Sequence, residues 1–313
     1  MSLTTQIAIA FLLDLLIGDP KGYPHPVKII AQRALRLEII FRNIFSNHKI
    51  SGIVTTLTVV SASFLTVWLI VQGMSLIHPW MGWGVSVFFI YTSLSIRSLY
   101  DESLPVLQSL KESNLIKARE RLSNIVGRDT NNLQQSEIVR ATVETVAEST
   151  VDGIIAPLFF AALGGAPLAI AYKSINTMDS LFGYKNATYL DFGWASARLD
   201  DLVNWLPARL ALPVIAVGAI LCGQSGKNSL AIALRDGCKH PSPNSGFPEA
   251  AMAGALGVRL GGASSYDGEI NIKPFIGDNA RELELSDIDR SHKIMFSASL
   301  LALATVFIVE KIL

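Results

Sequence analysis

The sequence predicts an all-α, polytopic helical membrane protein. Half of its 313 residues are hydrophobic and only 17% are charged, whereas an ordinary soluble domain carries about 25% charged residues. The mean hydropathy is +0.40. Between Lys49 and Arg97 the chain has no Asp, Glu, Lys or Arg, and this length accommodates two membrane spans of about 20 residues each. We therefore expect about five or six transmembrane or re-entrant helices, together with two large polar helical blocks.

Composition also excludes several classes of function. The net charge is zero and no long basic run occurs, so the electrostatic footprint of a nucleic-acid-binding protein is missing. Cys222 and Cys238 form neither a disulfide framework nor a familiar metal-binding spacing. The segment from Gly223 to Asn228 lacks the spacing and the hydroxyl group of a P-loop. The chain contains no His-Glu-x-x-His, no Gly-x-Ser-x-Gly and no internal repeat.

The first predicted span covers residues 2–18. It is apolar except for Asp14, and it has neither a basic segment before it nor a small-residue cleavage site after it. It is therefore expected to be a retained helix rather than a signal peptide. Gly18-Asp19-Pro20 should end the helix, because proline cannot extend it and disfavours helical geometry in the preceding residue.

His25 follows in an extended loop between Pro24 and Pro26. It is either a polar surface residue in a rigid turn or a ligand or acid–base residue presented at the membrane boundary. The nearby Asp19 and Lys28 favour the second interpretation.

The rest of the chain alternates between apolar and polar segments of one integral membrane domain, residues 1–313. Further spans are predicted near 53–72, 80–97, 153–172, 205–222 and 294–309, and polar blocks at 19–49, 97–152, 173–204 and 223–293. Lys and Arg are concentrated in the first, second and fourth blocks, which places them in the cytoplasm and the N-terminus outside. Simple alternation then puts the third block on the opposite side. The other possibility is that it folds back as re-entrant segments shielded by protein.

Three carboxylates, Glu144, Glu148 and Asp152, recur every four residues, so on a helix they share one face. They lie next to the apolar segment 153–172. Ionisable groups at a membrane boundary are costly unless they are paired or bound, and they therefore suggest a functional site. The alternative is that the glutamates line a solvated helix face and that Asp152 or Thr150 caps the next helix.

Polar side chains resume beyond the apolar segment. Lys173, Asn176 and Asp179 follow it directly, and Asp200 and Asp201 come later. Acid, base and amide groups thus flank both ends of one apolar segment, which favours a site over a solvated surface.

A turn at Gly127-Arg128-Asp129 precedes a helix that should begin near Ser136. Arg128 could bind phosphate there or pair with Asp129, and pairing is the expected outcome.

Residues 240–249 form another candidate region, with the sequence His-Pro-Ser-Pro-Asn-Ser-Gly-Phe-Pro-Glu. They introduce a helix of small residues at 250–257. A loop rich in Ser, Asn and Gly that opens a helix suits anion binding, because free N–H groups and the helix dipole point to the same place. An ordinary capped loop, with small residues serving only close helix packing, is the alternative.

Five of these motifs occur in order along essentially the whole chain. They are Asp14-Leu15-Leu16-Ile17-Gly18-Asp19-Pro20, Pro24-His25-Pro26-Val27, Glu148-Ser149-Thr150-Val151-Asp152-Gly153, Lys173-Ser174-Ile175-Asn176-Thr177-Met178-Asp179-Ser180 and His240-Pro241-Ser242-Pro243-Asn244-Ser245-Gly246. Together they resemble the integral membrane protein family of cobalamin (vitamin B12) biosynthesis, adenosylcobinamide-phosphate synthase. Five motifs at compatible spacing are far more specific than any one of them.

The resemblance implies a multi-pass protein of the inner, or cytoplasmic, cell membrane. The implied activity is ATP-dependent amide formation between a carboxylate of adenosylcobyric acid and the amine of aminopropanol phosphate or threonine phosphate, which gives adenosylcobinamide phosphate. The implied cofactors are ATP as co-substrate and Mg²⁺. The implied partners are the corrinoid, the amine and the lipid bilayer, with other membrane-bound cobalamin-assembly enzymes as further candidates.

Two other classes of function compete with this ligase. A distant relative linked to β-lactamase regulation shares part of the pattern, so a non-enzymatic regulatory or scaffold protein stays an alternative. A transporter is disfavoured, because charge gathers at the ends of the spans rather than within them.

The expected chemistry distributes roles among the candidate residues. Carboxylate activation needs Mg²⁺ and cationic or N–H donors for phosphoryl oxygens, and an attacking amine needs a base. The expected catalytic residues are His25, Glu148, Lys173 and Asp179; the metal ligands are Glu148, Asp152 and Asp179; and the substrate-binding residues are Asp19, Asn176, His240, Asn244 and Ser245. No nucleotide-binding loop is recognisable, so the sequence leaves the ATP site open.

Overall fold

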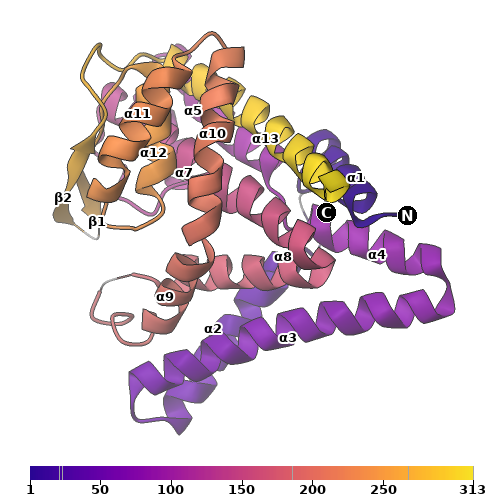
Figure 1. The fold of residues 1–313 in the computed structure, drawn as a ribbon. Coiled ribbons are helices and arrows are strands. Elements are labelled where there is room, and N and C mark those ends of the chain that lie inside the picture. Colours follow the sequence, from indigo (N-terminus) through magenta and orange to yellow (C-terminus); the bar gives the residue numbers. More distant parts are fainter. Residues whose placement is uncertain (21, 23, 185, 267, 313) are drawn as a thin grey trace. The chain divides into compact units, whose positions relative to one another are not determined.

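The structure is a computed structural model that describes residues 1–20, 22, 24–184, 186–266 and 268–312, except for the side chains of 311 and 312 (Figure 1). Within these residues the chain is helical apart from one two-stranded hairpin. The predicted all-α class of a polytopic membrane protein is therefore confirmed.

The elements divide between two compact units. The first unit comprises Met1–Ser95, Ala156–Asn204 and the chain from Thr305 onward, and the second comprises Ile96–Ile155 and Trp205–Ala304. The first contains α1 (Leu3–Ile17), α2 (Pro26–Ile44), α3 (His48–Ile77), α4 (Pro79–Tyr91), α8 (Ala156–Phe182) and α9 (Trp194–Val203). The second contains α5 (Ile96–Lys111), α6 (Leu115–Ser123), α7 (Gln135–Thr150), a π-helical turn (Val151–Ile155), α10 (Trp205–Leu221), α11 (Gly226–Asp236), a 3-10 turn (Gly237–Lys239), α12 (Gly246–Leu256), β1 (Leu260–Tyr266) and β2 (Glu269–Ile276). Helix α13 (Ser286–Ile312) begins in the second unit and ends in the first.

In the first unit, α3 contacts α2, α4, α8 and α9. Close approach is possible because Gly52 of α3 has no side chain; a Cβ there would lie 1.8 Å from the carbonyl oxygen of Phe192. Arg42 of α2 holds the same loop. Its Nη2 donates to the carbonyl oxygen of Thr188 (3.0 Å), and its guanidinium lies 4.3 Å from the centroid of the Phe192 ring.

Helix α8 is broken inside the predicted span 153–172. Gly164 and Gly165 have non-helical backbone angles, and Gly165 has φ +66°, a left-handed conformation that glycine adopts without steric cost. Pro167 follows two positions later and removes a further helical hydrogen bond. This apolar segment is therefore kinked.

The second unit is built on α12. Every residue of this helix is buried, and α12 packs against α7, α10 and α11. Gly254 allows the close contact with α11, because a Cβ there would lie 2.3 Å from the carbonyl oxygen of Asn228. The predicted use of small residues for close helix packing thus holds at this position.

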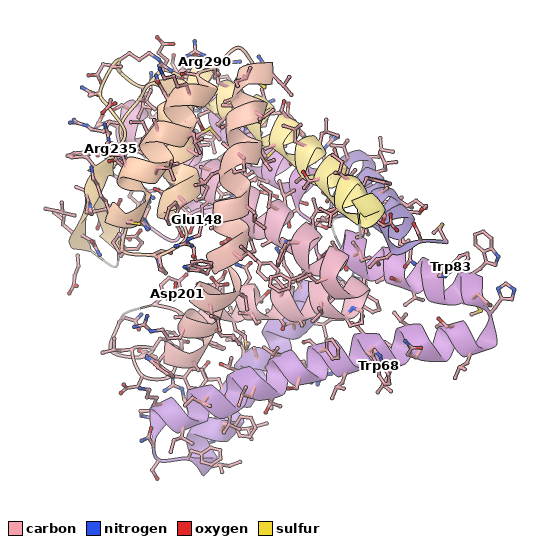
Figure 2. The ribbon with its side chains drawn as sticks, viewed as in Figure 1. Trp68, Trp83, Glu148, Asp201, Arg235 and Arg290 are labelled. Atoms are coloured by element: carbon pink, nitrogen blue, oxygen red, sulfur yellow. The ribbon has the colours of Figure 1, made fainter. Side chains whose placement is uncertain are left out.

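Among the described residues, three helical segments are long and apolar enough to cross a membrane. They are α3, the continuous run Gln135–Phe182 and residues Ser286–Glu310 of α13; α9 and α10 would add a fourth if they form one broken span, and α1 is a shorter apolar helix. Large apolar side chains are exposed on these elements, including Leu76 at 89% and Trp68 at 44% on α3 (Figure 2). Lipid rather than water suits such a surface.

Helix α4 is shorter than the predicted span at 80–97. It has 13 residues and ends at Tyr91, and the chain from Ile96 onward belongs to α5. The hydroxyls of Thr92 and Ser93 donate to the carbonyl oxygens of Phe89 and Ile90 (3.1 and 2.7 Å). These bonds satisfy carbonyl groups that lose their helical partners where the helix stops.

The antiparallel hairpin of β1 and β2 was not predicted. Its register shifts between Leu260 and Gly262, and Gly261 and Gly262 both have positive φ. A bulge with two glycines interrupts the alternation of apolar and polar residues by which a strand is recognised. The hairpin therefore leaves little trace in the sequence pattern.

Two glycines of α3 provide a test of this packing. Gly52→Ala should destabilise the protein by about 1–3 kcal/mol, because the new methyl group overlaps the Phe192 carbonyl. Gly73→Ala should be neutral or stabilising by roughly 0.5–1 kcal/mol, because nothing lies within 4 Å of the added Cβ and alanine favours the helix. Thermal unfolding in detergent, followed by circular dichroism, measures both; equal melting temperatures for the two variants would contradict the packing.

Candidate functional site

The predicted site residues fall into two groups, one in each unit. The second unit holds Glu148, Asp152, His240, Asn244 and Ser245, and the first holds Asp19, His25, Lys173, Asn176 and Asp179. Each group is described within its own unit.

In the second unit, Glu148 meets the loop before α12. Ser245 Oγ donates a hydrogen bond to Glu148 Oε1 (2.7 Å) and lies 3.1 Å from Ser242 Oγ. The two residues are 97 positions apart in sequence, so folding brings together two motifs that the sequence analysis singled out separately. Glu148 is half-buried, unlike a residue on a solvated helix face; Figure 2 labels its position.

Asp152 lies in the π-helical turn that follows α7. An extra residue per turn changes the direction of the side chains relative to a regular α-helix, and such turns are frequent at functional sites. The strict spacing of four that placed Glu144, Glu148 and Asp152 on one face therefore ends before Asp152.

Glu144 is held entirely by the protein. Its Oε2 accepts a hydrogen bond from Arg128 Nη2 (2.7 Å), and its Oε1 accepts one from the backbone N–H of Gly261 (2.8 Å). Both side chains of the ion pair are buried. Glu144 thus anchors the 127–129 turn and strand β1 to α7, and we assign it a structural role. The expected partner of Arg128 was Asp129; the ion pair found is with Glu144.

Asp129 instead fixes the other end of the hairpin. Its Oδ2 accepts hydrogen bonds from Ser265 Oγ (2.6 Å) and from the backbone N–H of Gly268 (2.9 Å). Asp129 of this turn and Glu144 of α7 therefore hold the hairpin at two points.

Glu249 is a buried carboxylate that the sequence analysis missed as a candidate. It lies in the first turn of α12 and is only 3% exposed. Burial, and next the negative charges of Glu144 and Glu148, raise its pKa well above the usual value, although Lys273 and Arg128 oppose the shift. The available signal was its position as the one charged residue in a run of apolar and small residues.

His240 lies next to Glu249, with its Nε2 3.7 Å from Glu249 Oε1. Burial, and next the positive charge of Lys273, lower the pKa of His240. Its Nδ1 accepts a hydrogen bond from the backbone N–H of Ser242 (3.0 Å), so we assign the proton of the neutral ring to Nε2. Nε2 is buried and has no hydrogen-bond partner in the described part of the chain.

The same histidine geometry occurs at each His-Pro pair. Nδ1 of His25 accepts from the Val27 N–H (3.3 Å), and Nδ1 of His78 accepts from the Trp80 N–H (3.3 Å). Proline has no N–H, so the first donor that the ring can meet is two residues on. Histidine before proline therefore acts as a helix or turn cap and keeps its proton on Nε2.

Asn244 is positioned by an arginine between two aromatic rings. Arg209 lies 4.3 Å from the Trp205 ring centroid and 4.5 Å from that of Phe247. Its Nη1 donates to the Trp205 carbonyl oxygen (2.7 Å) and lies 3.4 Å from Asn244 Oδ1. Stacking fixes the arginine, and Asn244 is buried beside it.

In the first unit, His25 contacts Asp19. Its Nε2 lies 3.2 Å from Asp19 Oδ1, and the hydroxyl of Tyr91 donates to the carbonyl oxygen of Gly18. Nδ1 of His25 caps α2, whereas the buried Nε2 lies near Asp19 without a hydrogen-bond partner in the described chain.

Lys173, Asn176 and Asp179 follow one another along α8. Lys173 Nζ lies 3.5 Å from Ser95 Oγ. Asn176 and Asp179 are both close to Asp200 of α9. Asp179 also lies over Gly183, where an added Cβ would be 2.1 Å from its Oδ1.

Asp200 ends a chain of buried hydrogen bonds. Tyr172 Oη donates to Asn204 Oδ1 (2.9 Å), and Asn204 Nδ2 donates to Asp200 Oδ2 (3.0 Å). Tyr172 and Asn204 are each 1% exposed and were not predicted. They orient Asp200 toward the end of α8 that carries Asn176 and Asp179.

No group of three or more His, Cys, Asp and Glu side chains is placed to hold a metal ion among the residues that the structure describes. Mg²⁺ needs only one or two carboxylates, because it keeps several water ligands. Glu148 suits this requirement: Ser245 occupies its Oε1, and Oε2 has no protein donor in the described chain. The proposed ligands Glu148 and Asp152 lie in the same unit, whereas Asp179 lies in the other.

Fold and site define a helical membrane protein with buried carboxylate and histidine groups beside an apolar core. Comparison with known families refines this class, because residues 7–295 match the family described as CobD/Cbib protein. The chain belongs to this family of cobalamin biosynthesis proteins.

Individual relatives agree with the family assignment. The chain is 48% identical over 295 residues to the "Cobalamin biosynthesis protein CobD" of Leptospira interrogans, covering 94% of each chain. It is 47% identical over 309 residues to the protein of the same name from Clostridium perfringens, covering 98% of each. It is 48% identical over 299 residues to the "Cobalamin biosynthesis protein CbiB" of Salmonella typhimurium, covering 95% of this chain and 94% of the relative. No solved structure matches the chain.

The anchoring role of Glu144 predicts a large loss of stability in Glu144→Gln. This variant leaves the buried Arg128 without a counter-charge, which costs about 3–5 kcal/mol. Glu112→Gln is the control, because Glu112 is exposed and, among the described residues, pairs only with exposed Lys117, so it should change stability by about 0.5 kcal/mol or less. Unfolding by heat or denaturant in detergent compares them, and equal stability would refute the anchor.

Glu249 predicts a pH dependence of stability. Its pKa is raised in the folded protein, so from pH 4.5, its ordinary value, up to the raised value the folded state binds more protons than the unfolded state. Stability is therefore lost as pH rises through this window. Glu249→Gln cannot release a proton and escapes this loss. As the pH is raised above 4.5, the melting temperature of the wild type should fall relative to that of the variant; a difference that does not change with pH would contradict the buried neutral carboxyl group.

Proposed function

We propose that the protein is an ATP-dependent ligase, adenosylcobinamide-phosphate synthase, which joins a carboxylate of adenosylcobyric acid to the amine of aminopropanol phosphate or threonine phosphate. The observation that carries the proposal is the hydrogen bond between Ser245 and Glu148 beside buried His240 and Glu249. It joins two of the motifs that resemble those of the synthase. Family membership in cobalamin biosynthesis supports the same assignment.

The electrostatics of this group suit acid–base chemistry on a large substrate. The pKa of Glu249 is raised, and that of His240 is lowered, so both side chains favour their neutral forms. Neighbouring groups with shifted pKa values are typical of catalytic sites. A neutral Nε2–H on His240 and a protonated Glu249 could both donate hydrogen bonds to amide or carboxylate oxygens of a corrinoid.

The remaining roles follow from the chemistry of each side chain. Bound ATP and Mg²⁺ would supply activation of the carboxylate. Glu148 and Asp152 would hold the metal ion, and Asn244 and Ser245 would orient the substrate. Ser245 already points toward the proposed metal ligand Glu148, because its hydroxyl donates a hydrogen bond to that carboxylate.

In the first unit, Lys173 would neutralise a phosphate group, and Asn176 and Asp179 would bind substrate or metal. Asp19 would hold the ring of His25, which it contacts at 3.2 Å. For His25 to remove a proton from the amine, one ring nitrogen has to become free, since Nδ1 accepts from Val27. Release of this cap on substrate binding is therefore part of the proposed role.

The proposed setting is the inner, or cytoplasmic, membrane, with further membrane-bound enzymes of cobalamin assembly as partners. The apolar helices support a membrane location. The polar motifs flank apolar segments of the chain, so the polar corrinoid would reach the site from a membrane boundary.

Reconstitution tests the activity directly. Purified protein in detergent is incubated with adenosylcobyric acid, ATP, Mg²⁺ and either aminopropanol phosphate or threonine phosphate, and corrinoid product and ADP are followed by chromatography. Product that requires both ATP and one amine is expected and identifies that amine. Folded protein that gives neither product nor ADP with either amine would favour the regulatory or scaffold alternative.

Substitutions test the assigned residues. Glu148→Ala and Lys173→Ala should each lower turnover by at least about 100-fold, since each removes a charge proposed to stabilise the transition state. Expression in the membrane and melting temperature should stay close to those of the wild type, because both side chains are only half-buried. The exposed residues Glu120 and Lys111 provide controls as Glu120→Ala and Lys111→Ala. Near-normal turnover in the first pair would overturn the assignment.

A further inference from the structure

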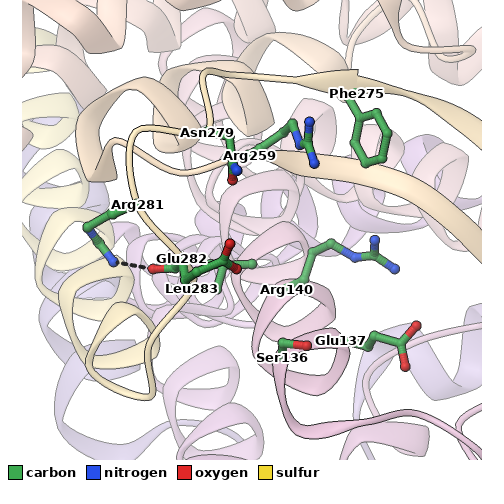
Figure 3. A pocket seen from close by; sticks show the side chains of 9 residues that line it. All are labelled: Ser136, Glu137, Arg140, Arg259, Phe275, Asn279, Arg281, Glu282 and Leu283. Carbon is green, nitrogen blue, oxygen red and sulfur yellow. Dashed lines mark hydrogen bonds between the residues drawn. The ribbon is translucent and has the colours of Figure 1, made fainter.

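A small cavity in the second unit lies apart from the groups described above. It has a volume of about 140 Å³ and is lined by the start of α7, by β2 and by the loop that precedes α13. Pockets for drug-sized ligands measure roughly 300–1,000 Å³, so this cavity suits a small group and excludes a corrinoid. Figure 3 shows its lining.

Three arginines line the cavity, Arg140, Arg259 and Arg281. Arg259 and Arg140 lie on the side of Phe275, and Arg281 lies on the opposite side (Figure 3). The guanidinium of Arg259 is 4.1 Å from the Phe275 ring centroid. An added Cβ on Gly262 would be 2.7 Å from the Phe275 ring and 3.0 Å from Arg140 Nη1, so the ring and the second guanidinium are neighbours.

The three arginines differ in how many of their guanidinium N–H groups already have partners in the protein. Arg281 is paired with Asp287 through two hydrogen bonds. Arg140 donates from Nη2 to the Ala263 carbonyl oxygen (2.7 Å), and its buried Nε, which has no hydrogen-bond partner in the described chain, forms an ion pair with Glu144 Oε1 at 3.9 Å. Arg259 is exposed and stacks on Phe275 without an acidic partner among the described residues. The guanidinium group of Arg259 therefore keeps its donors for an anion, and Arg140 adds its Nη1, since its other two nitrogens already face Ala263 and Glu144.

The carboxylates of the lining also differ. Glu137 Oε2 accepts from the backbone N–H of Gln134 (2.7 Å) as part of the capping box of α7. Glu282 is exposed and has no ion pair in the described chain. The cavity thus offers cationic donors at Arg140 and Arg259 and one available carboxylate at Glu282.

We propose that this cavity binds the phosphate group of a small phosphorylated amine, with Glu282 attracting the ammonium group. Planar guanidinium groups donate paired hydrogen bonds to phosphate oxygens, and the volume fits a phosphate with a short chain. This inference rests on the proposed function, whose amine substrate is a phosphate ester, and it gives that substrate a location. Phosphate is also present in ATP, and the experiment separates the two sources.

Binding is measured by isothermal titration in detergent with inorganic phosphate, aminopropanol phosphate and ATP. Arg259→Gln should weaken binding of inorganic phosphate and of aminopropanol phosphate by roughly 10- to 100-fold, the effect of one charge-assisted hydrogen bond. Glu282→Gln should weaken binding of aminopropanol phosphate only, because inorganic phosphate has no ammonium group. Arg121→Gln, at an exposed arginine of α6 in the same unit, is the matched control and should bind like the wild type.

Each result decides the proposal. Absence of phosphate binding to folded wild-type protein, or equal affinities of Arg259→Gln and Arg121→Gln, would overturn the site. Weakened ATP binding in Arg259→Gln with unchanged binding of aminopropanol phosphate would overturn the assignment to the amine. Turnover separates this proposal from the ligase assignment. An inactive wild type that binds phosphate through Arg259 refutes the ligase and keeps the site, whereas an active Arg259→Gln with a normal KM for the amine refutes the site alone.

Discussion

The second unit depends on the buried ion pair between Glu144 and Arg128. Its two carboxylate oxygens serve different partners, Arg128 and the backbone of Gly261, so one side chain joins α7, the preceding turn and strand β1. A buried pair of this kind adds little net stability, because both charges lose their hydration, but losing one partner is severe. Its effect is to fix α7, and α7 carries Glu148 one turn further on. The geometry of the candidate site thus depends on a residue with no spare group for substrate.

Negative charge accumulates around this anchor. Glu148 and Glu249 lie close enough to Glu144 for the pKa of Glu249 to rise, while Arg128 and Lys273 oppose the rise. A helix of small residues makes this arrangement possible, because α12 approaches its neighbours closely and excludes water. The low local dielectric then strengthens each electrostatic interaction. Close packing and shifted proton affinity are therefore two results of the same sequence segment.

Histidine before proline forms a second recurrent device. At His25, His78 and His240 the ring nitrogen Nδ1 caps the backbone two residues on, which fixes the tautomer and leaves Nε2 as donor. The first of these contacts Asp19, and the last faces Glu249. The motif thus holds the Nε2–H group of the ring in a fixed position. For His25 to act as a base through Nδ1, the hydrogen bond from the Val27 N–H to that nitrogen has to break. This constraint is visible only once the backbone partner is known.

The sequence alone determined the helical membrane class, since its long uncharged apolar runs are stable as helices in lipid. It also determined the family, through local motifs that occur in order along the chain. It also identified Glu148, His240 and Ser245 as candidates, because each lies in a short polar motif beside an apolar segment. Tertiary structure decided that Glu144 is an anchor, that Arg128 pairs with it and that Glu249 belongs to the same group. It also produced the hairpin and the arginine-lined cavity. The physical reason is distance along the chain: periodicity reports which residues share a face of one element, whereas burial and pairing depend on partners brought from elsewhere in the chain, such as Gly261 against Glu144, 117 residues away.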